Sequence, residues 1–288
     1  GLADTYALQP LYGTLAPREA FPKAIDAATT ALAIENRLAE AHTTLAYSRF
    51  LYEWRWEMAE EAFRRAIQLN PAYATGHHWY AYFLSSRGRF DEAIAEIETA
   101  VRLDPLSLVI NADLGMVLYF AGRIERALAQ FDRADELDPR FAYGYFGRAL
   151  ALEAAGRLDQ AVAAAARAVD LSGRSSVMLG TYGRLAAVDG RTGEARAILA
   201  ELTARAGEEY VSAAHPAMVQ TGLGDVEATL DWWERAAEER SRFVPFCGVW
   251  PIFERLVGEP RFERLIDAIG PVSGRNRPPA RPGREPAG

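Results

Sequence analysis

The chain has 288 residues, 50% of them hydrophobic, which suffices for one to two ordinary domains or one elongated array with a continuous core. Its net charge is −7, and the four arginines and one glutamate of the last eighteen residues leave about −10 for the remainder. This balance excludes a body that binds nucleic acid, because phosphate binding needs a basic face, and we expect no nucleic-acid partner.

The start of the sequence indicates a piece of a longer protein. It has no initial methionine, and GLADTYAL reads as the middle of a helix. No basic segment leads into an apolar stretch, and no run of about 18 apolar residues occurs, so we expect neither a signal peptide nor a membrane span. A cytoplasmic location is the expectation, and the periplasm is the alternative if a membrane span precedes this piece.

Residues 1–38 predict a partial, irregular helical unit. FPKAIDAATTALAI (21–34) has helical spacing, and residues 8–20 before it hold an insertion with Pro10 and Pro17.

Four units of similar length follow. The stops LNP, LDP, LDP and LSG recur at steps of 34 residues, and such a period indicates a repeat architecture. The same helical pattern precedes the last three stops, as GRFDEAIAEIETAVRLDP, GRIERALAQFDRADELDP and GRLDQAVAAAARAVDLSG. The units run roughly over 39–72, 73–106, 107–140 and 141–174.

Each recurring residue type has a physical reason. Gly88, Gly122 and Gly156 fall where one helix must stop and reverse, which favours a residue that accepts positive φ. Small residues two helical turns apart let neighbouring helices approach closely. These are the pairs Ala93 and Ala100, Ala127 and Ala134, and Ala161 and Ala168.

Two further units and a cap complete the chain. GRTGEARAILAEL (190–202) and GDVEATLDWWERA (224–236) mark a fifth and a sixth unit, giving about six units over residues 39–242. The segment YEWRW makes the unit at 39–72 one residue longer than the regular repeat. Pro216 falls inside an expected helix. Residues 243–270 predict two short helices that cap the array, and residues 271–288 predict a disordered Pro, Arg and Gly tail.

The combination of small residues, glycine and proline at one period resembles the tetratricopeptide repeat. This resemblance implies an all-α fold, a right-handed superhelical solenoid of antiparallel helix pairs. The whole chain is also similar to the C-terminal repeat region of bacterial multidomain signalling proteins, which follows a kinase, a nucleotide cyclase or a winged-helix regulator. The segments that carry this second similarity are GLADTYAL, YEWRW, NPAYATGHHWYAYFL, DPLSLVINADLG and PRFERLI.

Catalytic and metal motifs are missing from the sequence. It has no GxxxxGK[ST], HExxH or GxSxG pattern, and GLGD (222–225) has only two glycines after a helical pattern, so it predicts a turn. His77 and His78 diverge by about 100° on a helix and cannot readily share a metal. A single cysteine, Cys247, excludes an intrachain disulfide and a thiolate metal site. We therefore expect no catalytic residue, cofactor or metal, and no enzymatic activity in this region.

The first helix of each unit predicts a binding groove. In tetratricopeptide proteins these helices line a concave surface that holds a peptide or a partner helix. Each first helix has one small residue that we assign to the core, namely Ala46, Ala81, Gly115 or Ala149. The residue that follows it, and the residues about four positions to either side of that one, are assigned to the groove. The groove candidates are Tyr47, Phe50, His78, Tyr82, Met116, Tyr119, Phe120, Tyr143 and Phe146.

Most of these candidates are aromatic or apolar, which favours an apolar or aromatic peptide as the ligand. The alternatives are that a tight superhelix buries them, or that a missing domain or the chain's own tail fills the groove. The leading hypothesis is a scaffold for protein–protein contact, the docking or sensing arm of a larger signalling protein. Its partner would be a protein, a peptide, the upstream domain or a second copy. The alternative function is the regulatory or substrate-recruiting region of an enzyme whose catalytic domain lies upstream.

Overall fold

The structure is a computed structural model that describes residues 1–270, and this part of the chain is helical without strands. Fourteen of its helices form seven consecutive antiparallel hairpins, which confirms the predicted solenoid. The hairpins are α1 (Leu2–Leu8) with α2 (Pro17–Ile34), α3 (Ala39–Ser48) with α4 (Trp56–Leu69), α5 (Ala74–Ser86) with α6 (Phe90–Leu103), α7 (Leu108–Phe120) with α8 (Ile124–Leu137), α9 (Ala142–Ala154) with α10 (Leu158–Leu171), α11 (Ser176–Val188) with α12 (Thr192–Arg205), and α13 (Ala214–Leu223) with α14 (Val226–Glu238).

Five elements outside the hairpins, four of them short, complete the described chain, and the tail predicted to be disordered, residues 271–288, lies outside it. These five are the 3-10 helices η1 (Gln9–Tyr12), η3 (Val244–Phe246) and η4 (Pro251–Leu256), the π-helical turn η2 (Arg49–Glu53) and the helix α15 (Pro260–Ile269). None of the helices within residues 1–270 is long and apolar enough to span a bilayer.

The recurring glycines and alanines have the predicted roles. Gly88, Gly122 and Gly156 follow the first helices of their hairpins with φ of 74°, 70° and 76°. A side chain is strained in that conformation, so glycine reverses the chain at low cost. The small residues where helices cross are at most 1% exposed, which confirms the close approach of neighbouring helices. They are Ala93, Ala100, Ala127, Ala134, Ala161 and Ala168.

The irregular positions are accommodated locally. The extra residue of the YEWRW unit is absorbed by η2, a π-helical turn that ends at Trp54 with φ 58°. Pro216 lies in the first turn of α13, where its missing N–H has no intrahelical partner in any case. Gly224 ends α13 with φ 80°, whereas Gly222 lies inside the helix, so the turn predicted over residues 222–225 begins later than expected.

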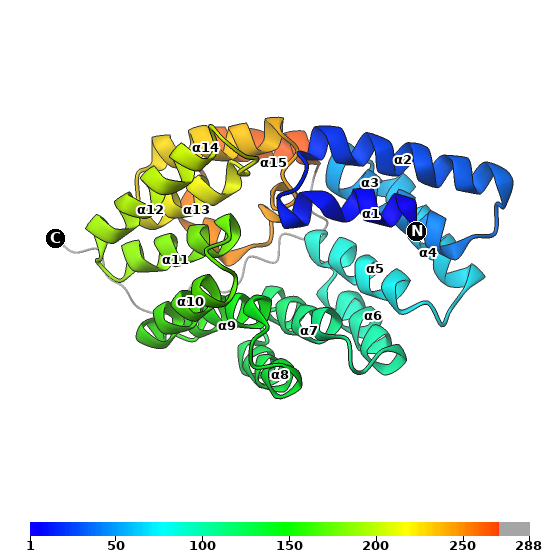
Figure 1. The fold of residues 1–288 in the computed structure, drawn as a ribbon, viewed down its shortest axis with the longest axis horizontal. Coiled ribbons are helices and arrows are strands. Elements are labelled where there is room, and N and C mark those ends of the chain that lie inside the picture. The colour runs from blue at the N-terminus through cyan, green and yellow to red at the C-terminus, as the bar shows by residue number, and fades with distance from the viewer. Residues whose placement is uncertain (271–288) are drawn as a thin grey trace.

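The array curves until its two ends meet. Figure 1 shows the first hairpin, in blue, next to α14 and α15, in yellow to orange. At the start of α2, the Arg18 guanidinium donates to the carbonyl of Glu238 at the end of α14. At the start of α4, Trp56 Nε1 donates to the carbonyl of Ile269 at 2.7 Å, at the end of α15. The described chain therefore forms a closed ring rather than an open arc.

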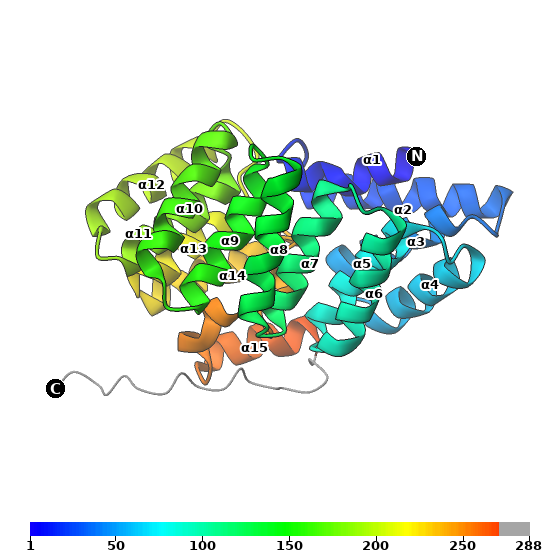
Figure 2. The same ribbon diagram turned by 90° about the horizontal axis from the view of Figure 1, so that it is seen from below.

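Residues 251–269 cover the last hairpin. Trp233 of α14 is buried, and its ring lies 4.7 Å from that of Phe253 in η4, which in turn stacks on Phe262 of α15 at 5.4 Å. Figure 2 shows α15 lying along one edge of the array. The aromatic contacts protect apolar surface that a terminal repeat would otherwise expose.

Candidate functional site

The predicted groove residues line the inner wall of the ring, but they do not form an exposed stripe. All nine lie on α3, η2, α5, α7 or α9, the elements that begin successive hairpins. Tyr82 and Tyr143 are half-buried, and the other seven are at most 8% exposed. The buried seven are Tyr47, Phe50, His78, Met116, Tyr119, Phe120 and Phe146. Of the alternatives that the sequence left open, an exposed groove and a covered one, the structure therefore favours the covered one. The role of these residues in binding a partner stays a prediction.

The chain itself covers this wall. Residues 243–250, here called the strap, leave the end of α14 and enter the ring, seen as the orange segment in Figure 1. Phe246 of the strap is 5% exposed. Its ring stacks on Phe120 at 5.3 Å and meets Tyr82 and Phe50 edge-on at 5.7 and 6.0 Å. One side chain of the strap thus contacts three successive hairpins.

Two further strap residues extend the aromatic contacts. Trp250 meets Phe120 edge-on at 6.4 Å and stacks on Phe243 at 5.7 Å. Aromatic pairs of this kind each add about 0.5–1.5 kcal/mol beyond the burial of their area. The strap is consequently an integral part of the folded inner surface and not a loosely placed loop.

Other candidates stack on neighbouring aromatic rings along the wall. Tyr47 stacks on Trp79 at 4.2 Å, and Tyr143 stacks on Phe146 at 5.5 Å. The sequence reasoning assigned these side chains to one wall because each occupies the same register in its hairpin. It missed Phe246, whose segment FVPFCGVW has no helical period to indicate where it packs.

A buried polar network interrupts this aromatic wall. Asp113 of α7, 5% exposed, accepts from the Tyr82 hydroxyl at 2.6 Å and lies 2.5 Å from His78 Nε2. The Tyr82 and Tyr143 hydroxyls are 2.9 Å apart. Burial and the nearby Asp113 carboxylate raise the pKa of both tyrosines far above its usual value, so both stay protonated. Asp113 was missed, and its signal was an acid inside the apolar run of α7.

The strap enters beside this network. Arg242 precedes the strap, and burial would lower the pKa of its guanidinium. The nearby oxygen atoms of Tyr47, Tyr143 and Tyr82 and the Asp113 carboxylate outweigh burial and raise it. Arg242 therefore stays charged next to the aromatic wall, at the point where the strap begins.

His77 faces away from the wall, as its helical register predicts. Its Nδ1 lies 2.6 Å from the Glu96 carboxylate of α6, and its Nε2 lies 3.0 Å from the Pro71 carbonyl. No three side chains suited to a metal converge within residues 1–270. Burial raises the pKa of the Cys247 thiol far above its usual range, so this side chain is a poor nucleophile.

His215 of α13 is a third buried histidine, and it lies at the base of the strap. It is 8% exposed, its ring meets Phe243 edge-on at 5.8 Å, and its Nδ1 has no hydrogen-bond partner within residues 1–270. Burial, with the positive charges of Arg242 and Arg205, lowers its pKa to about 3. His215 is therefore neutral in the folded protein at pH values where an exposed histidine is protonated.

This difference predicts a loss of stability in acid. The folded pKa of His215 lies below the value of about 6.5 that histidine has in unfolded chains, so the unfolded state takes up the proton first as the pH falls. Below pH 6.5 this group should reduce the free energy of unfolding by up to about 1.4 kcal/mol per pH unit. Urea unfolding at pH 7.5, 6.0 and 5.0 should show that the free energy of unfolding falls less with decreasing pH for His215→Gln than for the wild type.

His77 supplies the opposite comparison. The hydrogen bond to Glu96 raises its pKa, so its contribution to stability is present in acid and is lost as the pH rises through the raised pKa. The free energy of unfolding of His77→Gln should therefore fall more steeply with decreasing pH than that of the wild type, whereas that of His215→Gln should fall less steeply. Equal slopes for His215→Gln and the wild type would contradict the assignment of His215.

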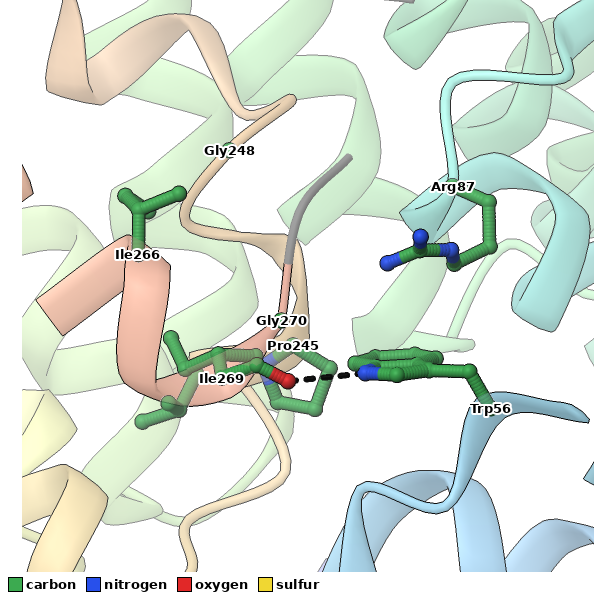
Figure 3. A pocket seen from close by; sticks show the side chains of 8 residues that line it. Trp56, Arg87, Pro245, Gly248, Ile266, Ile269 and Gly270 are labelled. Atoms are coloured by element: carbon green, nitrogen blue, oxygen red, sulfur yellow. Dashed lines mark hydrogen bonds between the residues drawn. The ribbon is translucent and has the colours of Figure 1, made fainter. Parts of the chain in front are cut away.

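A small hollow lies where α15 meets the first half of the array, as Figure 3 shows. The Arg87 guanidinium lies 4.5 Å over the Trp56 ring, whose Nε1 points to the Ile269 carbonyl. The hollow has no room for a water molecule, and Pro245 and Ile266 also line it. A β-carbon on Gly270 would lie 2.5 Å from Trp56 Nε1, so glycine permits this contact. The hollow is better suited to joining the ends of the ring than to holding a ligand.

Comparisons with known proteins agree with this geometry. Residues 48–107 and 112–176 match the family model of the tetratricopeptide repeat. The crystal structure of PilW, a type IV pilus biogenesis factor, superposes with a TM-score of 0.57 at 20% identity, covering 77% of this chain and 98% of that one.

Two other solved structures have similar scores. TTC0263, a thermophilic repeat protein of Thermus thermophilus, gives 0.55 at 20% identity, covering 69% of this chain and 99% of that one. PilF of Pseudomonas aeruginosa gives 0.52 at 21% identity, covering 78% and 97%. A search of curated proteins returns no match. At these identities the structural likeness shows the fold alone.

Proposed function

We propose that this array of tetratricopeptide repeats is a non-catalytic scaffold for protein–protein contact, whose inner wall recognises an extended segment rich in aromatic residues. In the structure the strap takes the place of that segment. A partner would bind by displacing the strap, and the strap would keep the aromatic wall covered until a partner arrives.

The observation that carries this proposal is the seat of Phe246. Three rings from three successive hairpins surround it, and Phe120, Tyr82 and Phe50 all belong to the register that predicts the groove. The strap is short, and Pro245 disfavours a regular helix. An extended partner segment with an aromatic side chain at the same place would make equivalent contacts with the wall.

A labelled copy of the strap tests this recognition. The probe is a fluorescent peptide with the sequence of residues 241–252, carrying serine in place of Cys247 to avoid oxidation. In the wild type the tethered strap competes at an effective concentration in the millimolar range, so the peptide should bind weakly. Phe246→Ala weakens the tethered competitor, and fluorescence anisotropy should report at least about tenfold tighter binding.

A second peptide with alanine at the position of Phe246 is the matched control, and it should bind neither protein. If Phe246→Ala folds poorly, the milder Phe246→Leu replaces it. Equal affinities of the first peptide for the variant and the wild type would contradict displacement. Binding of the alanine peptide would show that the aromatic seat is not the recognised feature.

The context of the scaffold is the second part of the proposal. Similarity of GLADTYAL, YEWRW and PRFERLI to the repeat regions of bacterial signalling proteins supports a docking or sensing arm in the cytoplasm. The alternative is a regulatory or substrate-recruiting region of a kinase or nucleotide cyclase. The gene upstream of Gly1 distinguishes these ideas. A kinase or cyclase domain there would favour the alternative, a winged-helix domain would favour the docking arm of a regulator, and a membrane span would contradict the location.

A further inference from the structure

A second surface feature lies outside the ring, at the seam between its two ends. It is an open cleft of about 410 Å³, within the size range of ligand sites in proteins. The N-terminal end of the array contributes two side chains, and α14, α15 and Arg240, which lies two residues after α14, contribute the others. The lining residues are Arg18, Trp54, Glu234, Ala237, Glu238, Arg240, Arg261, Arg264 and Leu265.

Two buried donors in this cleft have no acceptor. Trp54 Nε1 and Arg240 Nη1 are both buried, and neither has a hydrogen-bond partner within residues 1–270. The Arg240 guanidinium lies 3.7 Å over the Trp54 ring, which holds the two groups together. A buried donor without an acceptor is unfavourable, so two of them side by side indicate a missing acceptor.

Positive charge in the cleft exceeds negative charge. Four arginines line it, against Glu234 and Glu238. The Arg261 guanidinium pairs with Glu227, Asp231 and Glu234 at 2.7 Å each, and of these three acids only Glu234 lines the cleft. Within the described residues, the guanidinium of Arg18 donates to the backbone carbonyl of Glu238 and forms no ion pair.

Arg240 and Arg264 form no ion pair within residues 1–270, so three guanidinium groups face the single free carboxylate of Glu238. Burial and the nearby charge of Arg18 lower the pKa of Arg240, as expected for crowded like charges.

We propose that the seam cleft binds an acidic segment of a partner protein, with its carboxylates against Arg18, Arg240 and Arg264. A guanidinium presents parallel N–H donors that match a carboxylate, and these three guanidinium side chains line the cleft. Trp54, Ala237 and Leu265 give the cleft apolar surface for the side chains between the acids, which an inorganic anion would not use. Residues 1–270 have a net charge of about −10, so an acidic segment would be drawn to this cleft and repelled from most of the remaining surface of these residues.

This site is separate from the aromatic wall and has its own consequence. Arg18 and Trp54 belong to the first two hairpins, whereas Arg240 and Arg264 follow or lie beyond the last. A bound acidic segment would bridge the two ends of the ring. Because it binds the closed ring better than an opened one, it should raise the melting temperature in proportion to its occupancy.

Fluorescein-labelled hexaglutamate, titrated at low ionic strength and followed by anisotropy, is the test of the site. Arg264→Gln is the main variant, because Arg264 is exposed on α15 and its replacement leaves the packing intact. Arg18→Gln is the second. Each should weaken binding at least about tenfold and abolish the rise in melting temperature. Arg140→Gln, an equal change of charge at an exposed turn residue between α8 and α9, is the matched control and should bind as the wild type does.

Three results would overturn the proposal. Equal binding by the wild type and all three variants would place the peptide elsewhere, for example on the four arginines of residues 271–288. Equal weakening by Arg140→Gln and Arg264→Gln would mean that net charge alone attracts the peptide. Binding of pyrophosphate with the same variant pattern, but no binding of hexaglutamate, would identify a phosphate site instead.

Discussion

Phe246→Ala is expected to release the strap from the inner wall and to lower the free energy of unfolding by about 3–5 kcal/mol. The Phe246 side chain is 5% exposed and contacts rings of three hairpins, so its removal leaves a cavity that none of them can fill alone. The effect should be local, because residues within a repeat array contact mainly their neighbours.

Hydrogen exchange followed by mass spectrometry distinguishes local from global loss. Exchange should rise in residues 243–250 and in α3, α5 and α7, while α4, α6 and α8 stay protected. Val257→Ala, at a side chain that is 42% exposed, should change neither exchange nor melting. A uniform rise over the whole array would show that the strap cannot leave without unfolding the ring, and displacement by a partner would then be excluded.

Gly222→Ala is expected to destabilise the protein by about 1–3 kcal/mol although it adds only one methyl group. Its β-carbon would lie 2.8 Å from the Arg184 Cα of α11 and closer still to the Arg184 carbonyl oxygen. Those are backbone atoms, which cannot move aside as a flexible side chain can. A β-carbon on Gly180 would likewise meet the His215 backbone, where the same two helices cross. The helices α11 and α13 therefore have little freedom to separate.

Gly193→Ala provides the comparison. Gly193 lies in α12, and a β-carbon there would meet nothing within 4 Å. Alanine has the higher helix propensity, so this variant should be unchanged or more stable by up to about 1 kcal/mol. Chemical denaturation of both variants measures the difference. A Gly222→Ala protein as stable as the wild type would mean that the two helices cross less closely than the structure shows.

The two proposed binding surfaces share one structural cause, which is the closure of the ring. Closure brings the strap under the inner wall, and it also brings Arg18 and Trp54 against the end of α14. A partner that displaces the strap would weaken closure, whereas an acidic segment in the seam cleft would strengthen it. Occupants of the two surfaces should therefore oppose each other's binding.

The sequence predicted which helices carry the candidate residues better than it predicted the exposure of those residues. The nine candidates were located by counting from the small residue in each first helix, and in the structure they lie on α3, η2, α5, α7 and α9. Their exposure could not be counted in the same way, because it depends on the strap, which lies far from them in sequence. Asp113 could have been noticed as an acid in an apolar helix, but its contacts with Tyr82 and His78 cross between hairpins.

The sequence by itself determined the repeating unit, because its causes are local. A glycine that accepts positive φ, an alanine where helices cross and a proline that ends a helix act within one hairpin, and each recurs at the same spacing. Only the tertiary structure decided that the ends meet and that the strap fills the interior. Closure is the sum of small rotations between successive hairpins, which no single residue specifies. Phe246 contacts Phe50, and Arg240 contacts Trp54, only because these rotations together return the last hairpin to the first.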